Sequence, residues 1–124
     1  MMRIEIDPHS GFCGGVIRAI GTAEAYLREN GAPLFSLGAI VHNEEELSRL
    51  RGLQTVDDIA DMVSRPQGCR LLIRAHGEPP EVYDEAERLG LGLIDCTCPV
   101  VLRLQKMIRD TYAAVRPGGG QLLL

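Results

Sequence analysis

The chain has 124 residues, of which 45% are hydrophobic and 24% are charged, and its formal net charge is −4. These values are typical of one globular domain with a buried core and exclude a disordered chain. The acidic balance and the lack of an apolar run of about 20 residues argue against nucleic-acid binding and against a membrane span. The first ten residues have no apolar signal-peptide stretch, so we expect a cytoplasmic protein.

The first third of the chain is expected to form a strand, a helix and a second strand. Residues 3–7 (RIEID) predict a short strand. Apolar residues at helical spacing predict a helix over residues 14–30, and Gly31 is suited to end it. Residues 33–37 (PLFSL) predict the second strand.

A short charged helix is predicted after the second strand. Asn43 is its expected N-cap, Glu46 stands at the third helical position as in a capping box, and Gly52 marks its end. Residues 53–56 (LQTV) are expected to form a short strand, and residues 57–63 a helical turn.

The second half of the chain repeats the alternation of strand and helix. Residues 70–75 (RLLIRA) give the clearest strand signal, and a helix is predicted over residues 79–89. Residues 91–95 (LGLID) predict another strand. A last helix is expected over residues 99–114, because its first residue is a proline, which suits the first helical turn.

This order of elements predicts an α/β fold. Strands joined through helices imply right-handed crossovers, so we expect a mostly parallel sheet of four or five strands with helices on both faces. Residues 116–120 (RPGGG) are typical of a linker, and residues 121–124 (QLLL) of the start of another strand. We therefore predict one domain over residues 3–116, followed at residues 117–124 by a linker and the start of a truncated second domain.

Four reactive side chains are expected at one edge of this sheet. In open α/β sheets, ligands bind beyond the carboxyl ends of the strands. Cys13, His42, His76 and Cys98 each follow a predicted strand. Their convergence would give two thiols and two imidazoles, which suit a zinc ion, a cysteine nucleophile with a base, or an iron–sulphur cluster.

The four cysteines are expected to differ in role. Cys13 and Cys98 precede predicted helices, whose N-termini stabilise a thiolate, so both are candidate ligands or nucleophiles. Cys96 is expected to pack into the core, although an extended backbone would point it the same way as Cys98. Cys69 precedes its strand, which predicts a structural thiol at the opposite edge.

The histidines are distinguished by their neighbours. His76 precedes Gly77, which permits close approach of the backbone to a ligand, and His42 precedes the helix-capping Asn43. His9 is expected to make only a local hydrogen bond.

Four short motifs, GFCGGV, VHN, AHG and TCP, occur in an order and at a spacing that resemble the first third of the LytB/IspH family, the 4-hydroxy-3-methylbut-2-enyl diphosphate reductases. The resemblance covers residues 3–124. It implies one of three similar α/β domains around a cavity that holds a 4Fe–4S cluster on three cysteines. It also implies reductive removal of the hydroxyl of a small allylic diphosphate, giving isopentenyl and dimethylallyl diphosphates in the last step of non-mevalonate isoprenoid synthesis. Ferredoxin or flavodoxin would donate the electrons.

The resemblance assigns roles to four residues of this chain. Cys13 and Cys98 match cluster ligands, and His42 and His76 match histidines that bind the diphosphate. The third cysteine and the proton donor lie in family regions beyond residue 124, so no catalytic residue is assigned and the isolated chain is expected to be inactive. Cys96 stands where the family usually has a small residue. The alternative is a free-standing metal- or cluster-binding module that uses Cys13, Cys96 and Cys98 and has no reductase activity.

Overall fold

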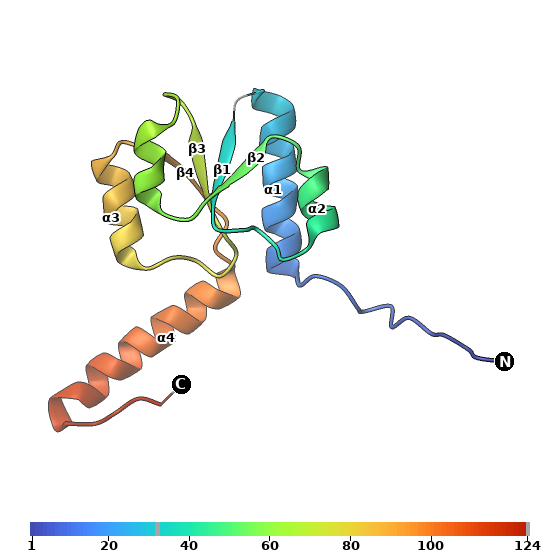
Figure 1. Cartoon of the computed structure of the whole chain (residues 1–124). Helices are drawn as coiled ribbons and strands as arrows, with labels where there is room; N and C mark the ends of the chain where they lie inside the picture. The colour runs from blue at the N-terminus through green and yellow to red at the C-terminus, as the bar shows by residue number, and fades with distance from the viewer. Residues whose placement is uncertain (32, 124) are drawn as a thin grey trace.

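The computed structural model describes residues 1–31 and 33–123, and it contains a four-stranded parallel sheet in the order β2-β1-β3-β4 (Figure 1). The strands are β1 (Leu34–Leu37), β2 (Leu53–Val56), β3 (Arg70–Ile73) and β4 (Gly92–Asp95). The helices are α1 (Gly14–Asn30), α2 (Glu44–Arg49), α3 (Pro80–Arg88) and α4 (Pro99–Val115), with 3₁₀ helices η1 (Ile59–Ser64) and η2 (Arg116–Gly118). The predicted parallel α/β fold is confirmed.

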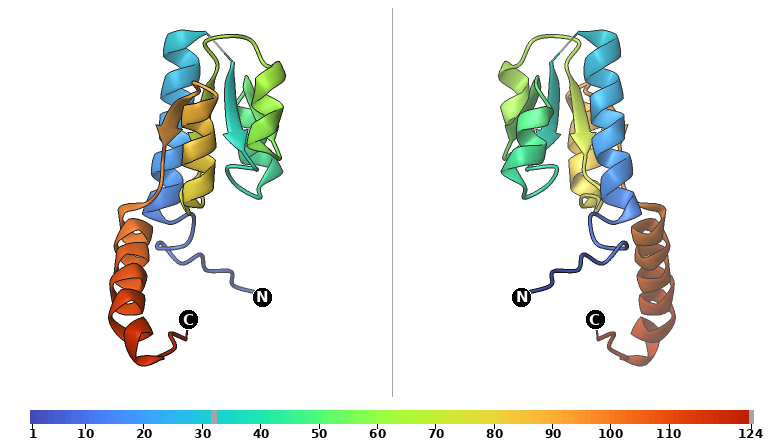
Figure 2. Two further views of the ribbon diagram at one scale, coloured as in Figure 1. Left: turned by 90° about the vertical axis from the view of Figure 1, so that its left-hand side faces the viewer. Right: turned by 90° about the vertical axis from the view of Figure 1, so that its right-hand side faces the viewer.

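The sheet buries side chains on both faces. Successive residues of a strand point to opposite faces of the sheet, so neighbours along one strand pack into different cores. Leu34 and Leu72 pack with α1 and the region of α2, whereas Phe35, Leu71 and Ile73 pack with η1 and α3. Figure 2 shows α1 on one side of the sheet and η1 and α3 on the other. Helices therefore cover both faces, as predicted.

The strand predicted over residues 3–7 does not form. This segment is irregular, its Ile4 and Ile6 side chains are exposed, and it runs away from the sheet in Figure 1. A strand needs a neighbouring backbone for its N–H and C=O groups, and no described strand pairs with this segment. Cys13 consequently reaches the sheet edge as the N-cap of α1 and not from the end of a strand.

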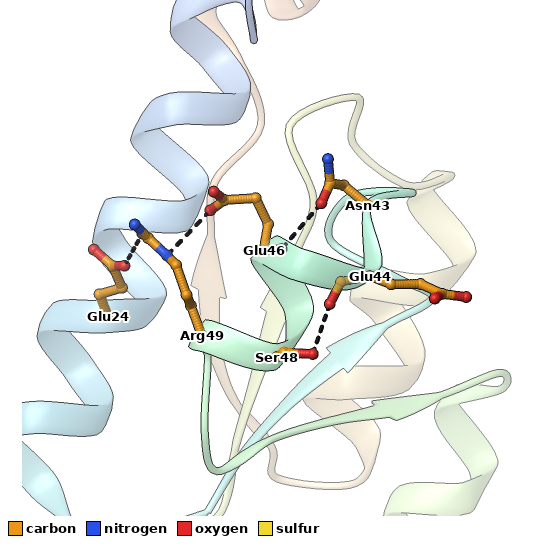
Figure 3. A network of polar contacts seen from close by, with 6 residues as sticks. All are labelled: Glu24, Asn43, Glu44, Glu46, Ser48 and Arg49. Carbon is orange, nitrogen blue, oxygen red and sulfur yellow. Dashed lines mark hydrogen bonds and ion pairs between the residues drawn. The ribbon is translucent and has the colours of Figure 1, made fainter.

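Helix α2 is fixed at both ends by polar contacts (Figure 3). The Asn43 side chain accepts a hydrogen bond from the Glu46 backbone N–H at 3.0 Å, which confirms the predicted N-cap. The Glu46 carboxylate lies 3.5 Å from Arg49 Nε. Arg49 also donates to Glu24 of α1 at 2.5 Å. The helix ends at Arg49, earlier than the predicted stop at Gly52, which instead lies in the turn before β2.

Helix α4 extends beyond the sheet (Figures 1 and 2). None of its described residues is buried. Five of its large apolar side chains are exposed: Val100, Leu102, Leu104, Met107 and Tyr112. After η2, residues 119–123 form no strand, and Leu124 lies outside the described residues. Within residues 1–31 and 33–123, no helix combines the length and apolar character needed to cross a bilayer.

Candidate functional site

A groove of about 620 Å³ lies at the carboxyl edge of the sheet. Its walls are the first turns of α1 and α4 and the loop that follows β3. Cys13, Cys98 and His76 line this groove together with Arg18. The structure therefore brings three of the four predicted site residues to one place.

His42 lies at the same edge but is not among the residues that line the groove. It occupies the loop between β1 and α2, where the capping bond of Asn43 fixes the start of the helix. The connections from β1 and β3 leave toward opposite sides of the sheet, because β1 leads to β2 and β3 leads to β4. The loops that carry His42 and His76 thus flank the topological switch point, which is the usual ligand position in such sheets.

Cys13 and Cys98 are the N-cap residues of α1 and α4. Both have extended backbone dihedrals, and neither sulphur accepts a capping hydrogen bond from the described helices. The partial positive charge of each helix N-terminus is therefore free to favour a thiolate or another anion in the groove. Cys13 is exposed and Cys98 is half-buried, so both are open to a ligand.

The first turn of α1 lies directly against Cys98. A Cβ atom added to Gly15 would come within 2.9 Å of the Cys98 Cβ and 3.0 Å of its Sγ, so this contact requires glycine. The Cys98 backbone N–H donates to the Ala75 carbonyl at 2.7 Å. Helix α1, the loop after β3 and the start of α4 therefore meet at Cys98.

The residue before Cys98 is held by side chains from the sheet and α3. Thr97 donates to the Asp95 carboxylate from its backbone N–H at 2.9 Å and from its hydroxyl at 2.5 Å. The Tyr83 hydroxyl lies 3.4 Å from the Thr97 hydroxyl, and burial raises the pKa of Tyr83 above its ordinary value of 10.0. Gly77, with a φ of +76°, packs against the Thr97 side chain. The close approach that the sequence suggested for a ligand is therefore made to Thr97 of this chain.

The other cysteines do not join the groove. Cys96 is 2% exposed in the core beneath α1, and burial raises the pKa of its thiol above 9.0, so it is a neutral core residue at neutral pH. Cys69 is buried at the opposite edge of the sheet, as expected. His9 is exposed, and its ring lies 3.3 Å from Asp7, as the sequence predicts.

The donor set fits part of a metal site. Thiolates are soft ligands that suit iron–sulphur clusters and zinc. Among the described residues, no three His, Cys, Asp or Glu side chains lie close enough together to hold a metal ion. The groove therefore offers a pair of thiols, and a complete centre requires further ligands.

Two contributors to the groove were not predicted from the sequence. Gly15 and Arg18 lie three residues apart, which places them on one face of α1 toward the Cys98 loop. That spacing is visible in the sequence, but the element against which this face packs is not.

The fold, the groove and the motifs together define a member of the LytB family. The LytB protein family model matches residues 4–116, and the chain belongs to that family. Among the relatives are the 4-hydroxy-3-methylbut-2-enyl diphosphate reductases of Porphyromonas gingivalis and Parabacteroides distasonis, at 50% and 47% identity. Both alignments cover 100% of this chain, but only 43% and 42% of the relatives. The chain thus spans well under half the length of the curated relatives it matches.

Solved structures of the same class share the fold. The E-1-hydroxy-2-methyl-but-2-enyl-4-diphosphate reductase of Plasmodium falciparum matches 86% of this chain with a TM-score of 0.76 and 32% identity. A second solved structure, the terminal enzyme of the non-mevalonate pathway, matches 96% of this chain with a TM-score of 0.66 and 35% identity. The chain covers 33% and 40% of these two structures, respectively.

Proposed function

We propose that this chain forms one part of a 4-hydroxy-3-methylbut-2-enyl diphosphate reductase. In this proposal Cys13 and Cys98 are two ligands of a 4Fe–4S cluster, and His42 and His76 bind the diphosphate of the substrate. The observation that carries it is the convergence of Cys13, Cys98 and His76 on one groove, with the two thiols at helix N-termini. Relatives with this name, 46–50% identical, support it.

The residues of this chain suit binding and orientation. Thiolates at Cys13 and Cys98 would hold the cluster from two helices that already touch through Gly15. Imidazoles at His42 and His76 donate hydrogen bonds to phosphate oxygens, more strongly when protonated. The N-termini of α1 and α4 add stabilisation of an anion.

The reaction needs chemistry that these side chains lack. Replacing the allylic hydroxyl by hydrogen, with release of water, consumes two electrons and two protons. A bound 4Fe–4S cluster supplies the electrons and a Lewis-acidic iron for the hydroxyl oxygen. We propose that ferredoxin or flavodoxin reduces it.

We further propose that residues 3–116 are one domain, with residues 117–124 leading to the next. The third cluster ligand and the proton donor then lie outside this chain. The 124-residue protein is accordingly expected to show no turnover in an anaerobic assay with reduced methyl viologen and substrate. Turnover by this protein would refute the proposed division of the site.

A chimera tests the function directly. The segment of the Porphyromonas gingivalis relative that aligns with this chain is replaced by this chain, and iron, acid-labile sulphide and reductase activity are measured anaerobically. We expect a loaded, active chimera that loses both properties on Cys13→Ser or Cys98→Ser. Cys69→Ser is the matched control, because this thiol is buried at the opposite edge. A fully loaded Cys13→Ser chimera would contradict the ligand assignment.

The alternative of a free-standing module has less support. It requires Cys96 to join Cys13 and Cys98, whereas the Cys96 side chain is buried in the core beneath α1. We therefore expect that Cys96→Ser leaves the metal content of the protein unchanged.

A further inference from the structure

Arg18 connects the helix of one candidate ligand to the loop of the other. It lies in the second turn of α1, the helix that Cys13 caps. Its Nη2 atom donates to the Thr97 carbonyl at 2.8 Å and lies 3.4 Å from the Cys96 carbonyl. Those two carbonyls belong to the residues immediately before Cys98. A guanidinium donor to a backbone carbonyl is a charge-assisted hydrogen bond, which is stronger than a neutral one.

Gly15 brings the same face of α1 against Cys98. Its missing side chain leaves space for the Cys98 Cβ and Sγ, which would lie 2.9 and 3.0 Å from an added Cβ. Arg18 then extends one turn further along this face to reach the carbonyls. Gly15 thus allows close contact between α1 and Cys98, and Arg18 adds hydrogen bonds to the backbone just before Cys98.

The rest of the loop is held from other elements. Asp95 and Tyr83 contact Thr97, and the Ala75 carbonyl accepts from Cys98. Those contacts orient the loop relative to β3, β4 and α3. Among the described residues, two contacts tie the loop to α1: the Arg18 guanidinium reaches the carbonyls of Cys96 and Thr97, and the Thr22 side chain hydrogen-bonds with the Cys96 thiol. The Arg18 bonds join the backbone just before Cys98 to the helix that Cys13 caps.

We propose that Arg18, together with the close contact at Gly15, is a positioning residue that sets the separation of the Cys13 and Cys98 thiols before any metal binds. This inference rests on the proposed function, in which Cys13 and Cys98 bind the same metal centre. It assigns Arg18 no contact with substrate and no part in electron or proton transfer.

Cross-linking of the two thiols by dibromobimane measures the proposed spacing without a metal. The reagent becomes fluorescent when both of its arms have reacted, so its rate in the 124-residue protein reports how often the sulphurs are correctly placed. Wild type is expected to cross-link, and Cys13→Ser is expected to abolish the signal. Arg18→Gln should lower the rate about tenfold, the size expected for losing a charge-assisted hydrogen bond. Arg18→Lys should restore part of it.

Two further variants make the test decisive. Arg28→Gln, an exposed arginine in the last turn of the same helix, is the matched control and should cross-link like wild type. Gly15→Ala should lower the rate although alanine favours the helix, because its Cβ would displace Cys98. Circular dichroism confirms that each variant is folded. If Arg18→Gln does not fold, Arg18→Lys and Gly15→Ala decide the question.

The outcomes separate this inference from the function on which it rests. A wild-type rate in both the folded Arg18 variants and Gly15→Ala overturns the positioning role and leaves the thiol pair intact. Absence of cross-linking in wild type overturns the thiol pair itself, and the positioning role with it. A reduced rate in Arg18→Gln and Gly15→Ala, with a normal rate in Arg28→Gln, supports the inference.

Discussion

The two edges of the sheet have grooves of similar size but different chemistry. The groove at the carboxyl edge is about 620 Å³, and the groove at the amino edge, lined by Arg65, Cys69 and Arg70, is about 670 Å³. Each edge carries a thiol. Size and the presence of cysteine therefore do not distinguish a site from an ordinary surface groove.

The difference lies in what the side chains of each edge already contact. At the amino edge, Arg65 stacks over Phe35 at 5.2 Å, Arg70 lies over Gly92, and Cys69 is buried. At the carboxyl edge, two helices begin at cysteines that make no capping hydrogen bond within residues 1–31 and 33–123, and the connections of β1 and β3 diverge. Helix polarity and strand order thus favour the carboxyl edge as the place for a ligand.

The largest expected effect separates the thiols of the two edges. Cys98→Ser should weaken binding of Cd²⁺ to the 124-residue protein by about 100-fold or more, because thiolate is the preferred ligand of a soft metal. Cys69→Ser should leave the affinity unchanged. Titration followed by thiolate-to-cadmium absorption measures both. Equal losses in the two variants would mean that the edges do not differ.

The next effect separates the two cores. Leu71 and Leu72 are both fully buried, but Leu72 lies beneath α1 and Leu71 beneath α3. Truncation of either to alanine should cost about 2–5 kcal/mol in urea unfolding. Only Leu72→Ala should also slow thiol cross-linking in folded protein, because α1 forms a wall of the groove. An equal effect from Leu71→Ala would show that the groove does not depend on the α1 face.

A smaller effect is expected at the loop that carries His42. Asn43→Ala removes the capping bond to Glu46 and should cost about 1 kcal/mol in thermal or urea unfolding. The NMR signals of His42 should shift, while those of His76 on the neighbouring loop should not. Asn30→Ala, at the far end of α1, is the control and should leave both histidines unchanged. An unshifted His42 would show that the cap does not position this loop.

The smallest effect is a pH dependence at Tyr83. Burial raises the pKa of Tyr83, so the folded state keeps a phenolic proton that the unfolded state releases from about pH 10.0. The stability that this residue contributes is thus complete below pH 10.0 and falls as the pH rises through the folded-state pKa. Tyr83→Phe should show a shallower loss of unfolding free energy above pH 10.0. If the unfolding free energies of wild type and Tyr83→Phe fell equally steeply with pH above pH 10.0, the raised pKa of Tyr83 would be contradicted.

The sequence predicted the parts of the molecule that depend on local pattern. The apolar run at residues 70–75 became β3, Asn43 caps α2, and the carboxyl ends of the strands correctly placed Cys98 and His76 at one edge. The family resemblance is confirmed by the match over residues 4–116. The site chemistry that it implies, which spacing alone left open, stays a proposal.

Features that depend on a partner were not predictable in this way. The alternation of Ile4 and Ile6 indicates one apolar side but does not say which backbone would pair with it, and none of the described strands does. The contact of Gly15 with Cys98 and the bonds of Arg18 arise from the approach of α1 to the start of α4. The spacing of Gly15 and Arg18 in the sequence places them on one face of the helix, but it does not show which element packs against that face.

The pairing of Cys13 and Cys98 is the central claim, and X-ray absorption of the cadmium-loaded protein tests it most directly. The spectrum counts the sulphur atoms bound to the metal. We predict two sulphurs per cadmium in wild type and in Cys69→Ser, and one in Cys13→Ser and in Cys98→Ser. Cadmium bound in wild type by oxygen and nitrogen alone, or a sulphur count unchanged by either substitution, would contradict the account.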